Sequence, residues 1–127
     1  MELIEQAKAA MEKAYAPYSG YKVGAALLCK DGSVFQGCNI ENSAFSPTIC
    51  AERAAFAAAV SAGKREFTAI AVCGGKEGKI EGAFPPCGVC RQVMKEFCDE
   101  DFKVYLINPD GYEETTLGAL LPMSFSL

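Results

Sequence analysis

The chain has 127 residues, half of them hydrophobic and 22% charged, so it is long enough to bury a core of its own and is expected to form one domain over residues 1–127. Its formal net charge of −4 and the lack of a lysine/arginine cluster argue against a binder of nucleic-acid polymers. It has no apolar segment long enough for a membrane span and no signal peptide in residues 1–6, so we expect a soluble, cytoplasmic protein.

The first predicted elements are a helix and a β-hairpin. Apolar side chains recur at helical spacing over residues 2–15, and Pro17 ends the pattern, which predicts an amphipathic helix. Residues 23–29 and 34–39 are apolar and rich in strand-forming side chains, and an Asp-Gly pair lies between them. Because Asp-Gly between two such runs favours a tight turn, we expect these strands to be antiparallel neighbours.

Beyond the hairpin, helices and strands are expected to alternate. Thr48 is placed to cap a second helix over residues 50–62. The continuous apolar run of residues 67–73 is typical of a buried central strand. The remaining predicted elements are a helix, two strands and a helical turn, over residues 88–97, 104–107, 112–115 and 116–121. This order predicts the α/β class, with a mixed five-stranded sheet between two layers of helices.

Cysteine and histidine usage narrows the possible chemistry. Seven cysteines, an odd number, in a chain without an export signal indicate reduced thiols rather than a disulfide framework. No histidine is present, so acid–base chemistry must rely on carboxylates and a metal site on thiolates. Four of the cysteines lie within predicted strands or a helix and are expected to pack as small hydrophobic residues: Cys29, Cys38, Cys73 and Cys98.

The other three cysteines lie where helices are expected to begin. Cys50 begins the second helix, and Cys87 and Cys90 begin the third. The positive end of a helix dipole stabilises a thiolate, the form that binds zinc, so two helix starts facing each other would form a three-thiolate pocket. Three protein ligands leave one position of tetrahedral zinc open for water, as in catalytic sites. Glu52, in the first turn of its helix, can reach that water without being a ligand.

Two other interpretations of the Cys-x-x-Cys pair remain open. The pair also resembles a thioredoxin-like redox dithiol, an interpretation that leaves Cys50 and Glu52 without a role. A structural zinc module would need a fourth thiolate, for which Cys38 or Cys98 is available. Metal stoichiometry separates a zinc site from the first alternative, and an ammonia assay separates a catalytic site from the second.

Two motifs, CAE at residues 50–52 and PCGVC at residues 86–90, together resemble the signature of the zinc-dependent cytidine deaminases. The similarity to the small, homotetrameric branch of that family, which acts on free nucleosides, extends over essentially the whole chain. The other matching segments are APYS at 16–19, VGAAL at 23–27, GCNIEN at 37–42, RQ at 91–92 and LLP at 120–122. The resemblance therefore implies the three-layer α/β/α, cytidine deaminase-like fold.

The resemblance also implies an activity, a metal and a proton carrier. The enzyme would hydrolyse cytidine and 2′-deoxycytidine to uridine and 2′-deoxyuridine with release of ammonia, as in pyrimidine salvage. Cys50, Cys87 and Cys90 would hold one Zn²⁺ per subunit. Glu52 would take a proton from the water on the metal, deliver it to N3 of the cytosine ring, and help to protonate the departing amine. A deaminase of another free base, nucleoside or antibiotic is the alternative within the superfamily.

Nucleoside contacts follow from the same resemblance. Asn39 and Glu41 would bind the ribose hydroxyls, and Tyr21 would flank the sugar and the base. Backbone groups around Ala51 and Pro86 would read the edge of the pyrimidine.

Subunit contacts and charge balance involve four further positions. Phe125 would reach from a neighbouring subunit of a homotetramer onto the base, so that each active site is shared. Three thiolates outweigh Zn²⁺ by one unit of charge, and hydrogen bonds from Arg53 and Arg91 would draw charge from the sulfur atoms. Phe45 stands where the family often has tyrosine, so one hydroxyl contact to the substrate or across subunits is expected to be missing.

Overall fold

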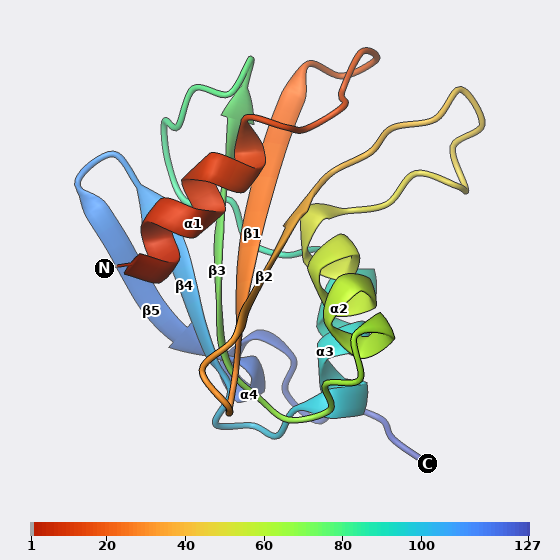
Figure 1. The fold of residues 1–127 in the computed structure, drawn as a ribbon, viewed down its shortest axis with the longest axis vertical. Helices are drawn as coiled ribbons and strands as arrows, with labels where there is room; N and C mark the ends of the chain where they lie inside the picture. Colours follow the sequence, from red (N-terminus) through yellow and green to blue (C-terminus); the bar gives the residue numbers. More distant parts are fainter. Residues whose placement is uncertain (1) are drawn as a thin grey trace.

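The computed structural model describes residues 2–127, which form a five-stranded sheet with helices on both faces (Figure 1). In chain order the elements are α1 (Glu2–Met11), β1 (Tyr21–Cys29), β2 (Val34–Cys38), α2 (Ala51–Ser61), β3 (Phe67–Lys76), α3 (Gly88–Phe97), β4 (Lys103–Asn108), β5 (Gly111–Thr116) and α4 (Leu117–Leu120). The strands are arranged in the order β2-β1-β3-β4-β5. The predicted three-layer α/β/α class with a mixed sheet is confirmed.

The sheet is mixed because one of its strand pairs is parallel. β1 pairs antiparallel with both β2 and β3, and β4 pairs antiparallel with β5. β3 and β4 are parallel neighbours, and α3 lies on the connection between them. Parallel neighbours require such a crossover, since a tight turn can only reverse the chain. The predicted hairpin is also confirmed, with Leu28 opposite Val34 near its turn.

Different helices cover the two faces of the sheet. Successive residues of a strand point to opposite faces, and β1 divides accordingly: Ala26 packs in the core under α1, whereas Ala25 and Leu27 pack in the core under α2 and α3. In Figure 1, α2 and α3 lie side by side on the face opposite α1. The starts of these two neighbouring helices carry the cysteines singled out in the sequence.

Two glycines allow the covering helices to approach the sheet closely. A Cβ atom placed on Gly24 would lie 2.2 Å from the carbonyl oxygen of Ala7 in α1. One placed on Gly37 would lie 2.4 Å from the carbonyl oxygen of Ala51 in α2. Side chains at these positions would displace helix backbone, which cannot yield as a flexible side chain can. Because Ala51 directly follows Cys50, Gly37 fixes how near the start of α2 lies to the sheet.

The first helix is shorter than predicted. α1 ends at Met11, four residues before the predicted end at residue 15. Tyr15 leaves the helical path to form a bridge with the segment after β2: its N–H donates to the Asn39 carbonyl at 3.0 Å, and its carbonyl accepts from the Glu41 N–H at 2.8 Å. These bonds replace the helical partners that the backbone would otherwise lose.

Thr48 does not cap α2, which corrects the sequence prediction. The N-cap residue is Cys50, and no side chain makes a cap hydrogen bond there. The Thr48 hydroxyl instead accepts a hydrogen bond from the Asn42 N–H at 3.2 Å, within the loop between β2 and α2. The first turn of α2 therefore keeps free N–H groups beside the Cys50 thiol. At the other end of the described chain, Thr116 does cap α4, by accepting from the Ala119 N–H at 3.2 Å.

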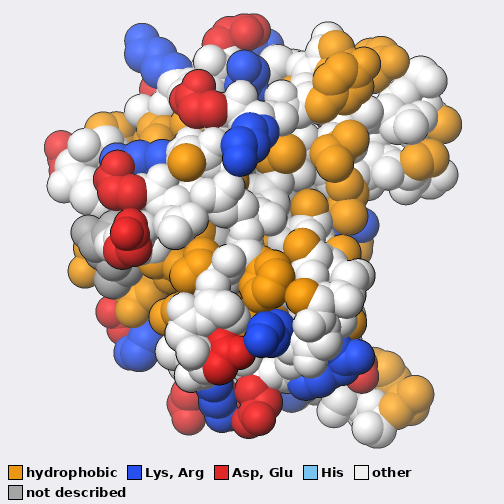
Figure 2. Space-filling view, in the orientation of Figure 1, with side chains coloured by type: hydrophobic (Ala, Val, Ile, Leu, Met, Phe, Trp, Pro, Cys, Tyr) orange, Lys and Arg blue, Asp and Glu red, His pale blue; other side chains and the backbone are white. Residues whose placement is uncertain are grey.

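Exposed hydrophobic side chains gather at two places on the surface. Tyr15, Tyr18 and Phe45 are 57%, 63% and 90% exposed, in the loops that precede β1 and α2. Figure 2 shows hydrophobic side chains over these loops at the upper right and at the end of the C-terminal tail at the lower right. Met123 and Phe125, within the C-terminal tail, are also exposed. No helix within residues 2–127 is long and apolar enough to cross a membrane.

Candidate active site

Three thiols meet where α2 and α3 begin. Cys50 and Cys87 are the N-cap residues of these helices, each with extended backbone and without a side-chain hydrogen bond that caps the helix N–H groups. The Sγ atoms of Cys50 and Cys87 are 3.8 Å apart, and those of Cys87 and Cys90 are 3.5 Å apart. All three sulfur atoms lie within 4.8 Å of one another. The sequence prediction that these two helix starts face each other is confirmed.

This thiol cluster fits a zinc ion. Tetrahedral zinc with Zn–S bonds of about 2.3 Å places its sulfur ligands roughly 3.8 Å apart, which matches the spacing of the three sulfur atoms. Thiolates are also the ligand type that zinc prefers. Within residues 2–127, the group of possible metal ligands is Cys50, Cys87 and Cys90. Neither Cys38 nor Cys98 joins the cluster among the described residues, so the structure does not support a four-thiolate module, and three thiolates would leave one position of a tetrahedral ion for water.

The cluster favours negative charge on its first sulfur atom. Hydrogen bonding with the Cys90 thiol and with Arg53 lowers the pKa of the Cys50 thiol to about 5, against the opposing effect of burial. The same contact with Cys50, together with burial, raises the pKa of Cys90. The guanidinium group of Arg53 lies with Nη2 3.4 Å from the Cys50 sulfur, one turn along α2. A positive charge therefore lies against the thiolates, as the sequence predicted for Arg53.

Glu52 is the one buried charged residue among residues 2–127, with 4% of its surface exposed. It lies in the first turn of α2, two residues after Cys50, and lines the pocket beside the thiols. Burial raises the pKa of its carboxyl group to about 7, and the negative charge of Cys50 acts in the same direction. A carboxyl group with a pKa near neutrality can both accept and donate a proton at neutral pH, which suits general acid–base chemistry.

The contacts of the Arg91 side chain differ from the sequence prediction that it would donate to the thiolates. Its Nε donates to the Pro86 carbonyl at 2.7 Å, and its Nη1 donates to the Leu120 carbonyl at 2.8 Å. These bonds hold the loop before α3 and the end of α4, and no thiol is among the hydrogen-bond partners that the described residues give this side chain. Arg53 is therefore the arginine that the structure places on the thiolates.

A pocket of about 240 Å³ opens above the thiols and Glu52. Its size is near the lower end for sites that enclose one small molecule, roughly 300–1,000 Å³. It is lined by Ser19, Tyr21, Val23, Asn39, Glu41, Thr48, Ile49, Cys50, Ala51, Glu52, Phe84, Pro85 and Cys87. The sequence prediction omitted Ser19, Val23, Thr48, Ile49, Phe84 and Pro85. A signal for Phe84 and Pro85 was available, because they directly precede the PCGVC motif.

Asn39 and Tyr21 lie together on one side of this pocket. The amide of Asn39 braces the start of β1, with Oδ1 accepting from the Val23 N–H at 2.9 Å and Nδ2 donating to the Tyr21 carbonyl at 2.8 Å. The Tyr21 ring faces the Phe84 ring, with 6.2 Å between centroids. Tyr21 lies in a different segment of the sequence from Asn39 and Glu41, and all three line this pocket.

Two predicted substrate residues lie away from the pocket surface. The Pro86 side chain is fully buried, so it can offer only backbone groups. Phe125 is 68% exposed, and its carbonyl accepts a hydrogen bond from Gln92 Nε2 of α3 at 3.1 Å. Phe125 does not line the pocket of its own chain.

Comparisons with known proteins agree with this geometry. The family model for the cytidine and deoxycytidylate deaminase zinc-binding region matches residues 1–106. A cytidine deaminase from Sporosarcina psychrophila is 55% identical over 126 residues, which cover 98% of this chain and 90% of the relative. One from Halalkalibacterium halodurans is 51% identical over 125 residues, covering 98% and 92%. The crystal structure of cytidine deaminase from Burkholderia pseudomallei has a TM-score of 0.90 and 51% identity, covering 98% of this chain and 97% of that one.

Proposed function

The chain belongs to the cytidine and deoxycytidylate deaminase family, and on this basis we propose that it hydrolyses cytidine and 2′-deoxycytidine to uridine and 2′-deoxyuridine with release of ammonia. The observation that carries the proposal is the meeting of three thiols within 4.8 Å beside the buried carboxyl group of Glu52. A redox dithiol would need only two of these four groups. Hydrolysis at a zinc site uses all four.

Cys50, Cys87 and Cys90 would hold one Zn²⁺ per subunit. When bound there, zinc acts as a Lewis acid that makes a water molecule acidic enough to be a nucleophile near neutral pH. Glu52 takes a proton from the attacking water and delivers it to N3 of the cytosine ring. It then helps to protonate the amino group that leaves C4, so that water and cytidine give ammonia and uridine. Arg53 offsets the excess negative charge of three thiolates.

The nucleoside would lie with its base toward the thiols and its sugar toward the loops. Backbone groups of Ala51 and Pro86 read the pyrimidine edge near Glu52. Asn39 and Glu41 bind the ribose hydroxyls, and Tyr21 flanks the sugar and base. Asn39, Glu41 and Tyr21 all line the pocket, which supports the arrangement.

The charge of the pocket favours a nucleoside over its 5′-monophosphate. Among residues 2–127, the pocket lining contains no lysine or arginine, whereas Glu41 and Glu52 both face it. A phosphate dianion would be repelled by the Glu41 carboxylate at the sugar end, and the nearby Lys76 ammonium group is engaged by the Ser19 carbonyl at 3.0 Å and does not line the pocket. The net charge of −4 disfavours a polynucleotide substrate for the same reason.

The active form is expected to be a homotetramer in which neighbouring chains share their sites. The exposed Tyr15, Tyr18 and Phe45 next to the pocket, and the exposed Phe125 in the tail, support this assembly. Phe125 would cover the pyrimidine bound by an adjacent subunit. The seven cysteines are all free thiols, which supports a reducing, cytoplasmic setting.

One assay panel tests the proposal. Ammonia release is measured with cytidine, 2′-deoxycytidine, cytosine, adenosine, 2′-deoxycytidine 5′-monophosphate and a cytosine-containing single strand, together with the zinc content of the protein. We expect turnover of the two free nucleosides and about one zinc per chain. Turnover of another substrate in preference to both nucleosides would refute the proposed specificity, and full activity without bound zinc would refute the mechanism.

A further inference from the structure

The carboxylate of Glu41 is held by three donors from one short turn before β1. Its Oε1 accepts from the backbone N–H groups of Tyr18 and Ser19 at 2.9 and 3.1 Å. Its Oε2 accepts from the Ser19 hydroxyl at 2.5 Å. These hydrogen bonds, the Ser19 hydroxyl first among them, lower the pKa of Glu41, so the carboxylate is charged at neutral pH. Ser19 therefore contacts both oxygen atoms of the group.

The three bonds leave one acceptor position with a defined direction. An ionised carboxylate offers about four lone-pair sites, two on each oxygen. The two N–H groups occupy both sites of Oε1, and the Ser19 hydroxyl occupies one site of Oε2. The second site of Oε2 remains free. Glu41, which carries it, lines the pocket, and so does Ser19. The Ser19 hydroxyl thus decides where that last acceptor site points.

The turn that carries Ser19 is itself anchored by the end of β3. The Lys76 ammonium group donates to the Ser19 carbonyl at 3.0 Å and lies 5.1 Å from the centre of the Tyr21 ring. The Glu77 N–H donates to the Gly20 carbonyl at 2.6 Å. The Ser19 hydroxyl also accepts from the Tyr21 N–H at 3.0 Å. The turn is therefore bound at its backbone from one side and holds Glu41 on the other.

We propose that Ser19 is a positioning residue for sugar recognition: it aims the free acceptor site of the Glu41 carboxylate at a ribose hydroxyl. The inference rests on the proposed function, which assigns Glu41 to the sugar. Ser19 acts through Glu41 and not on the reacting atoms. Without its hydroxyl, the two backbone N–H groups still hold Oε1, but Oε2 loses its only fixed partner and can turn away from the pocket.

The test compares two substrates that differ only at the sugar. Cytidine carries the 2′ and 3′ hydroxyls, and 2′,3′-dideoxycytidine lacks both. The ratio of kcat/KM for cytidine to kcat/KM for 2′,3′-dideoxycytidine should fall about 3- to 10-fold in Ser19→Ala, which is the effect of one hydrogen bond of ordinary strength. Ser19→Thr, which keeps a hydroxyl, should restore most of the ratio. Lys76→Met, which removes the ammonium contact to the Ser19 carbonyl and keeps the Ser19 hydroxyl, should lower the ratio in the same direction.

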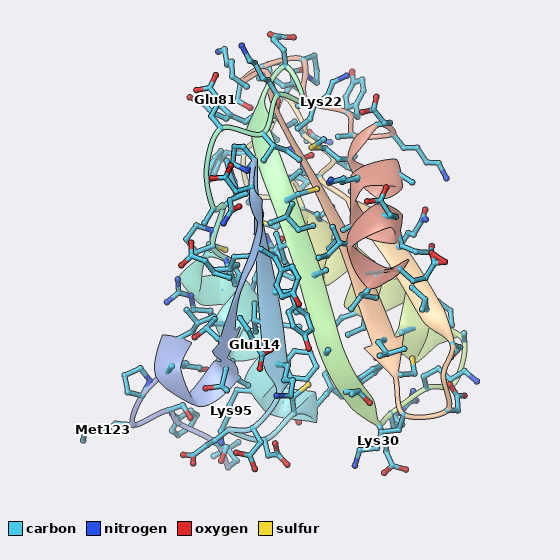
Figure 3. All side chains as sticks on the ribbon, turned by 90° about the vertical axis from the view of Figure 1, so that its left-hand side faces the viewer. Lys22, Lys30, Glu81, Lys95, Glu114 and Met123 are labelled. Atoms are coloured by element: carbon cyan, nitrogen blue, oxygen red, sulfur yellow. The ribbon has the colours of Figure 1, made fainter. Side chains whose placement is uncertain are left out.

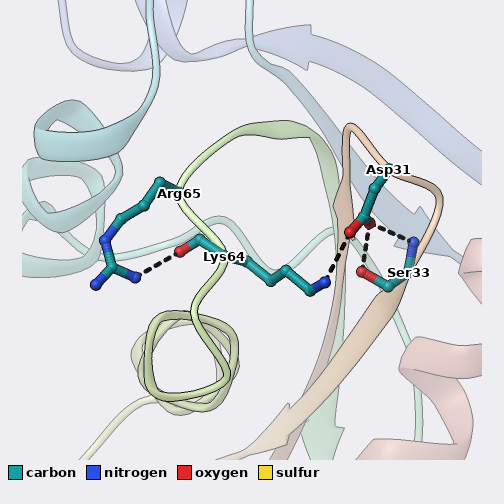
Figure 4. Close-up of polar contacts among 4 residues, drawn as sticks. All are labelled: Asp31, Ser33, Lys64 and Arg65. Atoms are coloured by element: carbon teal, nitrogen blue, oxygen red, sulfur yellow. Dashed lines mark hydrogen bonds and ion pairs between the residues drawn. The ribbon is translucent and has the colours of Figure 1, made fainter.

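Ser33 provides a matched control. Its hydroxyl also donates to a carboxylate, that of Asp31, at 2.6 Å in the turn between β1 and β2 (Figure 4). This turn lies at the opposite end of β1 from the pocket, as the positions of Lys22 and Lys30 in Figure 3 mark. Ser33→Ala therefore removes the same kind of bond far from the sugar, and the substrate ratio should stay at the wild-type value.

A double-variant cycle separates this inference from the proposed function. If Ser19 acts through Glu41, Ser19→Ala should change the ratio in the wild-type background and not in Glu41→Gln. Equal losses on both substrates in Ser19→Ala, or a further fall of the ratio in the double variant, would overturn the role of Ser19 while the role of Glu41 stands. A wild-type ratio in Glu41→Gln itself would overturn the assignment of Glu41 to the sugar, and the Ser19 inference with it.

Discussion

Replacing Gly37 of β2 by alanine should disturb the active site indirectly, by displacing the start of α2. The Cβ of alanine at this position would lie 2.4 Å from both the Ala51 carbonyl oxygen and the Ala55 nitrogen. Ordinary contacts begin near 3.4 Å, so the start of α2 must move by about 1 Å. That movement displaces Cys50 and Glu52 relative to Cys87, which lies on another helix. Misplacement of catalytic groups by about 1 Å costs on the order of 100-fold in rate.

Two other glycines separate loss of the site from loss of stability. Gly24→Ala overpacks the same sheet against α1, 2.2 Å from the Ala7 carbonyl oxygen, but α1 carries no residue of the pocket. Both variants should lose about 1–3 kcal/mol of unfolding free energy, the usual cost of overpacking. Gly82→Ala, where an added Cβ meets nothing within 4 Å, should leave stability unchanged.

The assay combines denaturant unfolding with kcat/KM for cytidine and zinc content, measured on protein that is still folded. We expect a large fall of kcat/KM in Gly37→Ala and a small one in Gly24→Ala, although the two variants are destabilised to a similar extent. If Gly37→Ala keeps wild-type kcat/KM, or if Gly24→Ala loses as much activity, the close approach of α2 does not set the geometry of the site.

Three further predictions concern the chemistry itself. Glu52→Gln should keep zinc and fold but lose turnover by several orders of magnitude, because an amide cannot carry the proton; near-normal kcat with zinc present would remove Glu52 from the mechanism. Cys87→Ala should lose zinc and activity together, as metal analysis can show, whereas Cys38→Ala should keep both. Phe125→Ala should lower kcat/KM for cytidine about 5- to 150-fold, as expected for one base–aromatic contact. Subunit exchange between Phe125→Ala and Glu52→Gln chains should restore part of the activity, and mixed tetramers without any recovery would contradict a shared site.

The metal centre could be predicted because its signals are local. A cysteine at a helix start acts within one turn of the chain. Cys50 and Cys87 each follow a proline-containing segment that disfavours a helix, and Cys90 lies three residues after Cys87, in the first turn of α3. The prediction that Thr48 caps α2 was wrong because of a backbone pairing between residues more than one turn apart. Ile40 and Ile49 exchange backbone hydrogen bonds of 3.0 and 3.1 Å, which fixes the loop in a path that turns the Thr48 hydroxyl toward the loop. Sequence spacing does not contain that pairing.

The two arginines show the same limit. Arg53 lies three residues after Cys50, so one helical turn returns its side chain to the sulfur, as local geometry predicts. Arg91 lies four residues after Cys87, a spacing that also favours side-chain contact on a helix. Its guanidinium group nevertheless donates to the Pro86 carbonyl and to the Leu120 carbonyl, and only the fold brings Leu120 within reach.

Through Arg91 and Gln92, α3 also holds the C-terminal segment of the chain, which leads to a prediction for Arg91. Both side chains hold the C-terminal segment, Arg91 through the Leu120 carbonyl at 2.8 Å and Gln92 through the Phe125 carbonyl at 3.1 Å. Arg91→Ala should therefore keep about one zinc per chain while it lowers kcat/KM for cytidine by no more than Phe125→Ala does. The part of the loss that acts through the tail should not add in the double variant, whereas the part that acts through the Pro86 carbonyl, which Arg91 holds at 2.7 Å, should add. Loss of zinc in Arg91→Ala would show instead that this arginine supports the thiolates, directly or by holding Pro86 beside Cys87.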